Sequence, residues 1–166
     1  MPKEQPSRRP AVAAWAALLQ VHAAFVPELD AELRKATGLP LAWYDVLLEL
    51  DAAGPMRMSD LGDKVVLSRT RVSRLVVELE TNGLLRREHN PDDGRSAIVT
   101  ITDLGRRRFR EAAPQYLDGI ERRIGAHTTP EELEALAATL RAVLDASRRG
   151  HPNRVPPTTS SQWPRS

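Results

Sequence analysis

Residues 58–105 constrain the fold more than any other part of the chain, because two helical patterns are followed there by two strand-like ones. The first helix is predicted from a cap at Ser59 to residue 66, and the second from a cap at Ser68 to Gly83. Only a short turn separates them. We therefore expect two packed helices joined by a tight turn, with one face of the second helix in a core.

A β-hairpin is predicted after these helices. Residues 84–89 and 96–101 have strand-like patterns, and the second alternates apolar and polar side chains. The loop between them is extended and carries Asp93, Gly94 and Arg95. Thr102 can cap the helix that follows. This order predicts a mainly α fold with a small β-hairpin, which is the arrangement of a winged helix-turn-helix.

Long helical patterns flank this unit. Residues 11–36 and 104–148 repeat apolar side chains at steps of three and four, as helices do when they pack along other helices. Pro27 predicts a kink or a restart of the first helix, and Pro114 predicts a kink in a later one. A capping box from Thr129 opens the last helix. These helices carry more apolar surface than a small unit can bury, so we expect a homodimer.

Both ends of the chain are predicted to be disordered. Residues 1–10 and 149–166 combine several prolines with charged and small polar residues. The remaining residues 11–148 are expected to form one domain, in which residues 41–103 make up the winged unit and the flanking helices mediate dimerisation. A chain of 166 residues with 41% hydrophobic residues is the size of a single domain with one core.

The composition excludes several classes of protein. There is no cysteine, so disulfides, thiolate metal sites and thiol redox sensing are absent. No segment reaches roughly 18 consecutive apolar residues, so we expect a soluble, cytoplasmic protein without membrane contact. The net charge of +2 is too small to indicate nucleic-acid binding by itself, so the distribution of the charges matters more than their sum.

Catalysis is not expected. No spacing typical of metal ligands joins the four histidines, which are His22, His89, His127 and His151. The carboxylates lie mostly in predicted caps and on predicted helix surfaces, and no nucleophile can be matched with a base. The sequence therefore predicts neither an enzyme nor a bound cofactor or metal.

The second helix of the pair has the side chains that a major-groove helix needs. Its predicted core face consists of Val72, Leu75, Val76 and Leu79. The residues turned away from the core are Thr70, Arg71, Ser73, Arg74, Val77 and Glu78. An arginine can bond guanine O6 and N7 together, and serine or threonine can meet phosphates or base edges. A solvated, arginine-rich helix face is the alternative interpretation.

The hairpin loop favours the first interpretation. Arg95 lies at the end of a loop that no core can bury, so it can either stay in solvent or enter a narrow minor groove. Asp93 would repel phosphate if it were free, and it makes better sense as the partner that holds a nearby arginine. An arginine-rich helix and a basic hairpin tip at this spacing together indicate DNA binding.

The sequence resembles the multiple antibiotic resistance regulator (MarR) family of bacterial winged-helix transcription factors, over roughly residues 11–148. The residues that carry the resemblance are Met58 to Leu61, Ser68 to Arg74, Leu79, Glu80, Gly83, Leu84, Asp93 to Arg95 and Ile101 to Gly105. The resemblance implies a homodimer with interlocked terminal helices. It also implies recognition helices in successive major grooves of a pseudo-palindromic operator, wings in the flanking minor grooves, and repression relieved by a small aromatic or anionic ligand.

Two sets of candidate site residues follow from the residues and the resemblance together. The candidates for DNA binding are Ser59, Ser68, Arg69, Thr70, Arg71, Ser73, Arg74, Asp93 and Arg95. The resemblance places ligands where the dimer helices meet the winged unit, and the candidates there are Trp15, His22, Trp43, Asp45, Arg74 and Arg86.

Each ligand candidate also has a structural interpretation, which we favour. A salt bridge between Asp45 and either Arg74 or Arg86 is expected, because charged groups near a dimer seam usually pair. His22 is expected to be a hydrogen-bonded core residue, and Trp15 and Trp43 are expected to be core residues rather than ligand contacts. For the whole protein, the alternative function is an interaction module that keeps the winged fold without reading DNA.

Overall fold

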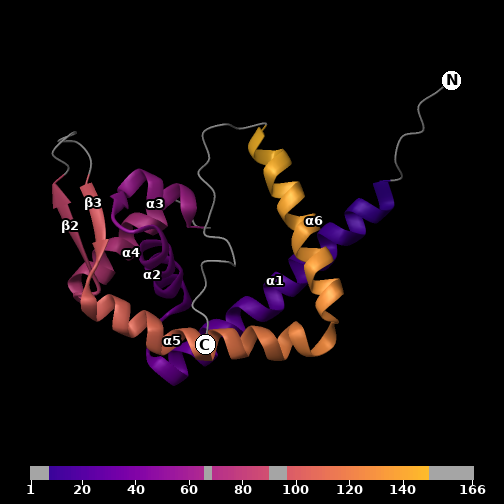
Figure 1. Cartoon of the computed structure of the whole chain (residues 1–166), viewed down its shortest axis with the longest axis horizontal. Helices are drawn as coiled ribbons and strands as arrows, with labels where there is room; N and C mark the ends of the chain where they lie inside the picture. Colours follow the sequence, from indigo (N-terminus) through magenta and orange to yellow (C-terminus); the bar gives the residue numbers. More distant parts are fainter. Residues whose placement is uncertain (1–7, 66–68, 90–96, 150–166) are drawn as a thin grey trace.

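The computed structural model describes residues 8–65, 69–89 and 97–149. The elements, in chain order, are α1 (Arg8–Thr37), α2 (Leu41–Ala53), β1 (Met56–Arg57), α3 (Met58–Lys64), α4 (Arg69–Thr81), β2 (Leu85–His89), β3 (Ala97–Ile101), α5 (Asp103–Arg123), a 3₁₀ turn η1 (Gly125–His127) and α6 (Pro130–Arg149). The described part is mostly helical with one small sheet, so the predicted fold class is confirmed. Figure 1 shows the winged unit, made of α2 to β3, at one end of the molecule, with α1, α5 and α6 extending away from it.

The α1 helix is one continuous element despite its internal proline. Pro27 lies within the helix, so the predicted restart at that residue is wrong. Two different environments occur along its length: residues 9–24 are exposed, whereas Leu29 and Leu33 are buried in the core. The helix also begins at Arg8, so residues 8–10 were wrongly assigned to a disordered arm. Only the second half of α1 is thus built into the core of this chain.

The α5 helix crosses this buried half of α1 at close range. Gly119 is buried at the crossing, and a Cβ there would lie 2.7 Å from a methyl carbon of Leu29. In the first third of α5, Phe109 is buried with its ring centroid 5.0 Å from that of Tyr44 in α2. The ring of Tyr116 lies on Tyr44 in an edge-on arrangement. One aromatic cluster therefore joins α5 to α2.

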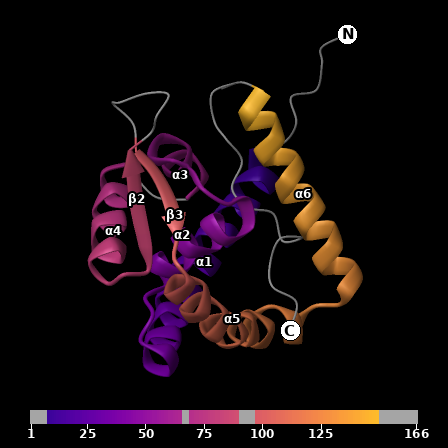
Figure 2. The same ribbon diagram turned by 60° about the vertical axis from the view of Figure 1, so that its left-hand side comes forward.

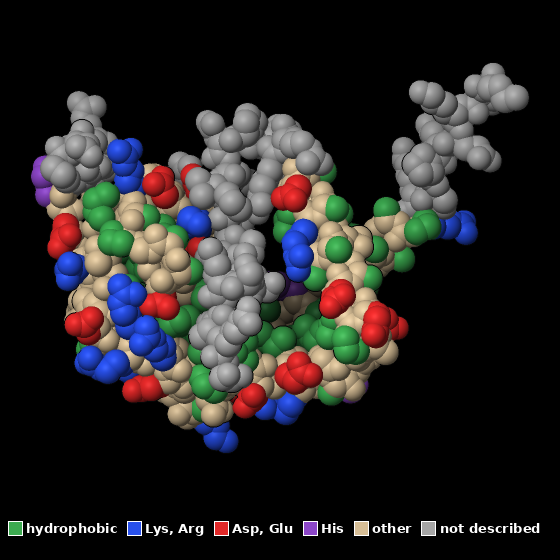
Figure 3. Space-filling model, viewed as in Figure 1, with side chains coloured by type: hydrophobic (Ala, Val, Ile, Leu, Met, Phe, Trp, Pro, Cys, Tyr) green, Lys and Arg blue, Asp and Glu red, His purple; other side chains and the backbone are tan. Residues whose placement is uncertain are grey.

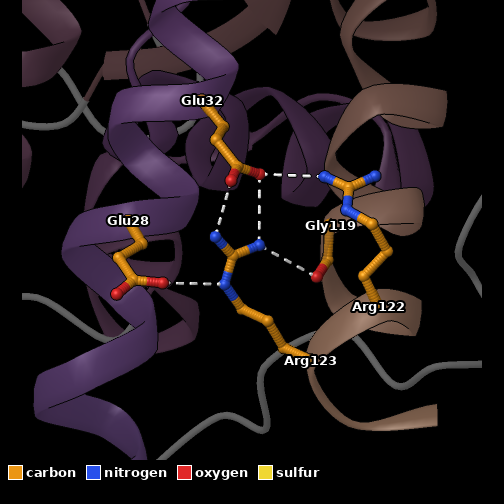
Figure 4. A network of polar contacts seen from close by, with 5 residues as sticks. All are labelled: Glu28, Glu32, Gly119, Arg122 and Arg123. Atoms are coloured by element: carbon orange, nitrogen blue, oxygen red, sulfur yellow. Dashed lines mark hydrogen bonds and ion pairs between the residues drawn. The ribbon is translucent and has the colours of Figure 1, made fainter. Parts of the chain in front are cut away.

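Ion pairs reinforce the crossing on its outer side (Figure 4). The Arg123 guanidinium donates to Glu32 over 2.6 Å and to Glu28 over 3.1 Å, and Arg122 adds a contact of 3.0 Å to Glu32. Hydrogen bonding to Arg123, more than any other factor, holds the pKa of the Glu32 carboxyl below its usual value. The network fixes the angle between α1 and α5 through directional contacts, since a fork of guanidinium N–H groups matches a carboxylate in only a few orientations.

The sheet has three antiparallel strands in the order β1-β3-β2. The predicted hairpin is confirmed, and its register pairs Leu85 with Ile101 and His89 with Ala97. At its base, the Thr102 hydroxyl accepts from the Gly105 N–H over 3.0 Å and donates to the Gly83 carbonyl oxygen over 2.7 Å. The predicted Thr102 cap of α5 is confirmed, and it ties the hairpin to the start of that helix.

The α6 helix stands apart from the winged unit. Figures 1 and 2 show it leaving the end of α5 at a sharp turn and running well away from α2, α3 and α4. The capping box predicted at its start is present: the Thr129 N–H donates to the Glu132 carboxylate over 2.9 Å, and the Glu132 N–H donates to the Thr129 hydroxyl over 3.3 Å. Within the single chain, most of this helix is exposed.

Large apolar side chains are exposed on both helices that flank the winged unit. On α1 they are Val12, Trp15, Leu18, Leu19 and Val21, and on α6 they are Leu136, Val143 and Leu144. Figure 3 shows hydrophobic side chains on the inner side of α6 and on α5, toward the space that these helices enclose with α1. By length and composition, α1 would also suit a membrane span, with a mean hydropathy of 1.4 in a window that is 6% buried.

Candidate nucleic-acid interface

The α4 helix has one buried and one exposed face, as predicted. The side chains of Val72, Val76 and Leu79 are almost fully buried, and Leu75 is 8% exposed. The exposed side chains are Thr70, Arg71, Ser73, Arg74, Val77, Glu78 and Thr81. The alternation of three and four residues between the buried positions is what makes this segment helical and attaches it to α2 and α3. The arginines are thereby turned outward.

The exposed face has a central line and two flanks. Successive residues of a helix are rotated by about 100° about its axis. The line directly opposite the buried face consequently consists of Thr70, Arg74, Val77 and Thr81. Ser73 and Glu80 flank it on one side, and Arg71 and Glu78 on the other. This line projects farthest from the core of the winged unit.

Both glutamates of the flanks are held by neighbouring elements. On one side, Trp43 Nε1 of α2 donates to the Glu78 carboxylate over 3.2 Å. On the other side, the Glu80 carboxylate accepts from the backbone N–H of Arg87 over 3.1 Å and from its Nε over 2.7 Å, and it forms an ion pair with the same guanidinium. Hydrogen bonding to Arg87 holds the pKa of the Glu80 carboxyl below its usual value. The central line is left without a negative charge.

The Glu80–Arg87 contact was missed by the sequence analysis. It joins the last turn of α4 to the first strand of the hairpin, and so it sets how the hairpin stands against the helix. The signal that could have revealed it is an acid in the last turn of the helix, followed by an arginine on the exposed side of the next strand. The β1 strand, which pairs Met56 with Val99, supports the hairpin from the other edge and was also missed.

Several predicted DNA-binding residues are placed by the structure and others are not. Thr70, Arg71, Ser73 and Arg74 are brought together on the exposed face of α4. Ser68, Asp93, Arg95 and the side chain of Arg69 lie outside the described residues. Ser59 is exposed on α3, but it does not cap that helix: the N-cap is Arg57, and the Ser59 hydroxyl donates to the Asp60 carboxylate over 3.2 Å. Because β1 ends at Arg57, the helix starts earlier than predicted.

The predicted ligand candidates do not converge within one chain. Two candidates lie on the exposed first half of α1: Trp15, with 60% of its surface exposed, and His22. The expectation that they are core residues of this chain is therefore wrong. Trp43 is half-buried and bonded to Glu78. Arg86 of β2 donates to Glu88 over 2.7 Å rather than to Asp45. The residues therefore occupy separate elements of the single chain.

Asp45 has an unusual environment. Among the described residues, no hydrogen bond or ion pair joins its carboxylate to another group, so the predicted salt bridge to Arg74 or Arg86 is wrong. Burial raises the pKa of Asp45 to about 7, with further contributions from the charges of Glu49 and Asp30. Its proximity also contributes to raising the pKa of Tyr116 to about 12, although burial of the phenol is the larger cause.

An open hollow of about 480 Å³ lies at the base of the hairpin. It is lined by Gly83, Arg86, Thr100, Ile101, Thr102, Asp103, Leu104 and Arg106. Arg86 and Arg106, its two arginines, have partners within the chain, since they bond Glu88 and Asp51 over 2.7 and 2.9 Å. Of the ligand candidates, only Arg86 borders this hollow.

The chain is similar to known bacterial regulators in sequence and in structure. Residues 37–96 match the model of the MarR family. The HTH-type transcriptional regulator YxaD of Bacillus subtilis is 30% identical over 104 residues, which are 63% of this chain and 73% of that protein. The family match covers most of the winged unit, including all of α4.

Solved structures extend the similarity to the flanking helices. Sco3205 of Streptomyces coelicolor, a MarR family transcriptional regulator solved in complex with DNA, is 28% identical, with a TM-score of 0.75 and coverage of 88% of this chain and 91% of that one. Sco5413 of the same organism, also a MarR family transcriptional regulator, is 30% identical, with a TM-score of 0.69 and coverage of 83% and 95%. The chain therefore belongs to the MarR family of transcriptional regulators.

Proposed function

We propose that this regulator binds a pseudo-palindromic DNA operator as a homodimer, with α4 of each subunit in the major groove. The observation that carries the proposal is the outward line of α4, which presents Thr70 and Arg74 while both neighbouring glutamates are held aside. Arginine is the commonest specific partner of guanine in the major groove. Sco3205, which has this fold, was solved in complex with DNA, and this supports DNA binding by the present chain.

The remaining DNA contacts are proposed from the position of the hairpin. Asp93 and Arg95 belong to the segment of the sequence that joins β2 and β3, and we assign Arg95 to the flanking minor groove. Ser59 and Ser68 are assigned to phosphate contacts at the starts of α3 and α4, together with Arg69. These contacts would position the protein, whereas α4 would read the bases.

The exposed apolar surface of α1 and α6 supports the homodimer. A twofold axis buries the same patch twice, which removes both copies from water. Insertion of α1 into a bilayer is a poor explanation for its apolar surface, because Leu29 and Leu33 are in the protein core and Glu28 and Glu32 bind Arg123. A dimer interface, by contrast, would use only the exposed first half of α1. We expect a soluble cytoplasmic protein without catalytic activity.

We also propose that a small aromatic ligand releases the DNA. In a single chain the candidates Trp15 and His22 lie far along α1 from the winged unit, so a site that includes them requires the partner subunit. An anionic ligand would meet the negative surroundings of Asp45, Glu49 and Asp30, and it would need Arg74 or Arg86 for charge balance. Screening of phenolic compounds for loss of operator binding tests this part of the proposal.

The decisive experiment is selection of bound sequences from a random DNA pool, followed by affinity measurements on the selected operator. Arg74→Ala should cost about 1 to 3 kcal/mol of specific binding, and Arg71→Ala should cost a similar amount. Arg110→Ala, an exposed arginine on α5, is the matched control and should bind as the wild type does. Selection of no common sequence would contradict DNA reading and favour an interaction module, as would affinity that does not fall with salt.

A further inference from the structure

We infer that Val77 reads the 5-methyl group of a thymine in the major groove, and that this apolar contact adds to the specificity of the operator. The inference rests on the proposed function, since it places α4 in that groove. It assigns a role in base recognition to a side chain that cannot form a hydrogen bond.

Val77 is the exception among the apolar residues of α4. Its surface is 47% exposed, whereas Val72 and Val76 are 1% and 0% exposed. A β-branched residue loses side-chain freedom in a helix, so an exposed helix position gains nothing from valine in the free protein. A single exposed apolar residue is ordinary on a protein surface. Its exposure alone therefore indicates nothing, and the position of Val77 on the helix is the relevant observation.

That position is the centre of the outward line. Val77 follows Arg74 by three residues and Thr70 by seven, which places the three side chains on one stripe of the helix. The next residue of the stripe, Thr81, is occupied locally, because its hydroxyl donates to the Val77 carbonyl oxygen over 2.9 Å. A groove that receives Thr70 and Arg74 consequently meets Val77 next.

The charges around Val77 also favour contact with DNA. The two acids nearest to it along the helix are Glu78 and Glu80, and each would repel phosphate if it extended toward the groove. Instead, Glu78 accepts from Trp43 on the α2 side, and Glu80 is bound to Arg87 on the hairpin side. Val77 is left as an uncharged apolar surface between two acids whose carboxylates are bonded to neighbouring elements.

The chemistry of the groove identifies the base. Only thymine presents a methyl group there, whereas cytosine presents an amino donor and guanine presents two acceptors. Three residues advance a helix by about 4.5 Å, and successive bases on a strand are about 3.4 Å apart. The thymine read by Val77 should thus lie one or two base pairs from the base that Arg74 contacts.

The test removes the methyl group from the DNA and the isopropyl group from the protein, separately and together. On the selected operator, each thymine of a half-site is replaced in turn by uracil, which differs from thymine only by that methyl. The wild-type protein should lose about fourfold in affinity at one thymine position, the effect of exposing one buried methyl-sized group. Val77→Ala should bind the thymine operator more weakly, and it should not distinguish thymine from uracil at that position.

Leu104→Ala is the matched control, because Leu104 is also an exposed apolar residue, with 41% of its surface exposed, but it lies on α5. It should keep the wild-type ratio of the two affinities. The inference is overturned if no thymine is sensitive to the replacement, or if Val77→Ala keeps the full thymine preference. Failure of the wild-type protein to bind any selected DNA would instead overturn the proposed function, and the inference with it.

Discussion

The environment of Asp45 should make the folded protein less stable as the pH rises, and a single substitution should remove this dependence. Burial raises the pKa of Asp45 from 3.8 to about 7, with Glu49 and Asp30 adding repulsion. Between these two pH values the folded protein holds a proton that the unfolded chain releases. The folded state binds more protons in that window, so the free energy of unfolding decreases as the pH rises through it.

The magnitude follows from the size of the shift. Each unit corresponds to about 1.4 kcal/mol, so a shift of about three units amounts to about 4 kcal/mol as an upper bound. Asp45 is only half-buried as a residue, so solvent reduces this energy, and we expect a destabilisation of about 2 kcal/mol. The full destabilisation is present above about pH 7, and none of it is present below about pH 4.

Asp45→Asn keeps the shape of the side chain and cannot carry the charge. At pH 8 the variant should be about 2 kcal/mol more stable than the wild type, and the difference should shrink toward pH 5. The assay is urea unfolding followed by circular dichroism from pH 5 to pH 8, at one fixed protein concentration because dimerisation contributes to stability. Carboxylates with a lowered pKa, such as Glu32, titrate equally in both proteins, so their contributions cancel in the stability difference. A stability difference that stays constant over this range would refute the reasoning.

Three further predictions concern the framework of the winged unit. Gly105→Ala should lower the free energy of unfolding by about 3 kcal/mol, because the new Cβ would collide with a backbone carbonyl oxygen. Gly119→Ala should cost less, because its Cβ meets only the end of a leucine side chain, and equal costs in urea titrations would contradict this. Phe109→Ala should cost about 3 to 5 kcal/mol, since the ring is buried at the junction of α5 and α2, and a cost under 1 kcal/mol would show that the junction is not needed. Glu80→Gln should remove protection of DNA by the hairpin in hydroxyl-radical footprints while protection under α4 remains; parallel loss of both would argue against a positioning role.

The elements could be predicted from the sequence wherever their pattern is local. The apolar spacing of α4 and the capping box at Thr129 depend on residues within a few positions of one another, and both are present in the structure. The two-residue strand β1 is too short to give a pattern, and it forms because Met56 meets Val99 far along the chain. The wrong N-cap at Ser59 followed from missing that strand.

The partners of charged side chains were harder to predict. Asp45 was expected to pair with an arginine, yet Arg86 lies beside Glu88 on the same strand and bonds it instead. Arg87, the next residue, points to Glu80 of α4, a contact that depends on how the hairpin folds back. Residue types indicate which groups need a counter-charge, but only the tertiary fold decides which of several candidates is within reach.

The length of α5 has a mechanical consequence. It is one continuous helix from the hairpin base to the turn before α6, with Pro114 inside it, and its 21 residues span about 32 Å. A tilt of about 5° at the α6 end would displace the hairpin base by about 3 Å, close to the rise of one base pair. A rearrangement too small to disturb packing among the terminal helices would thus be amplified into a mismatch with the spacing of the operator.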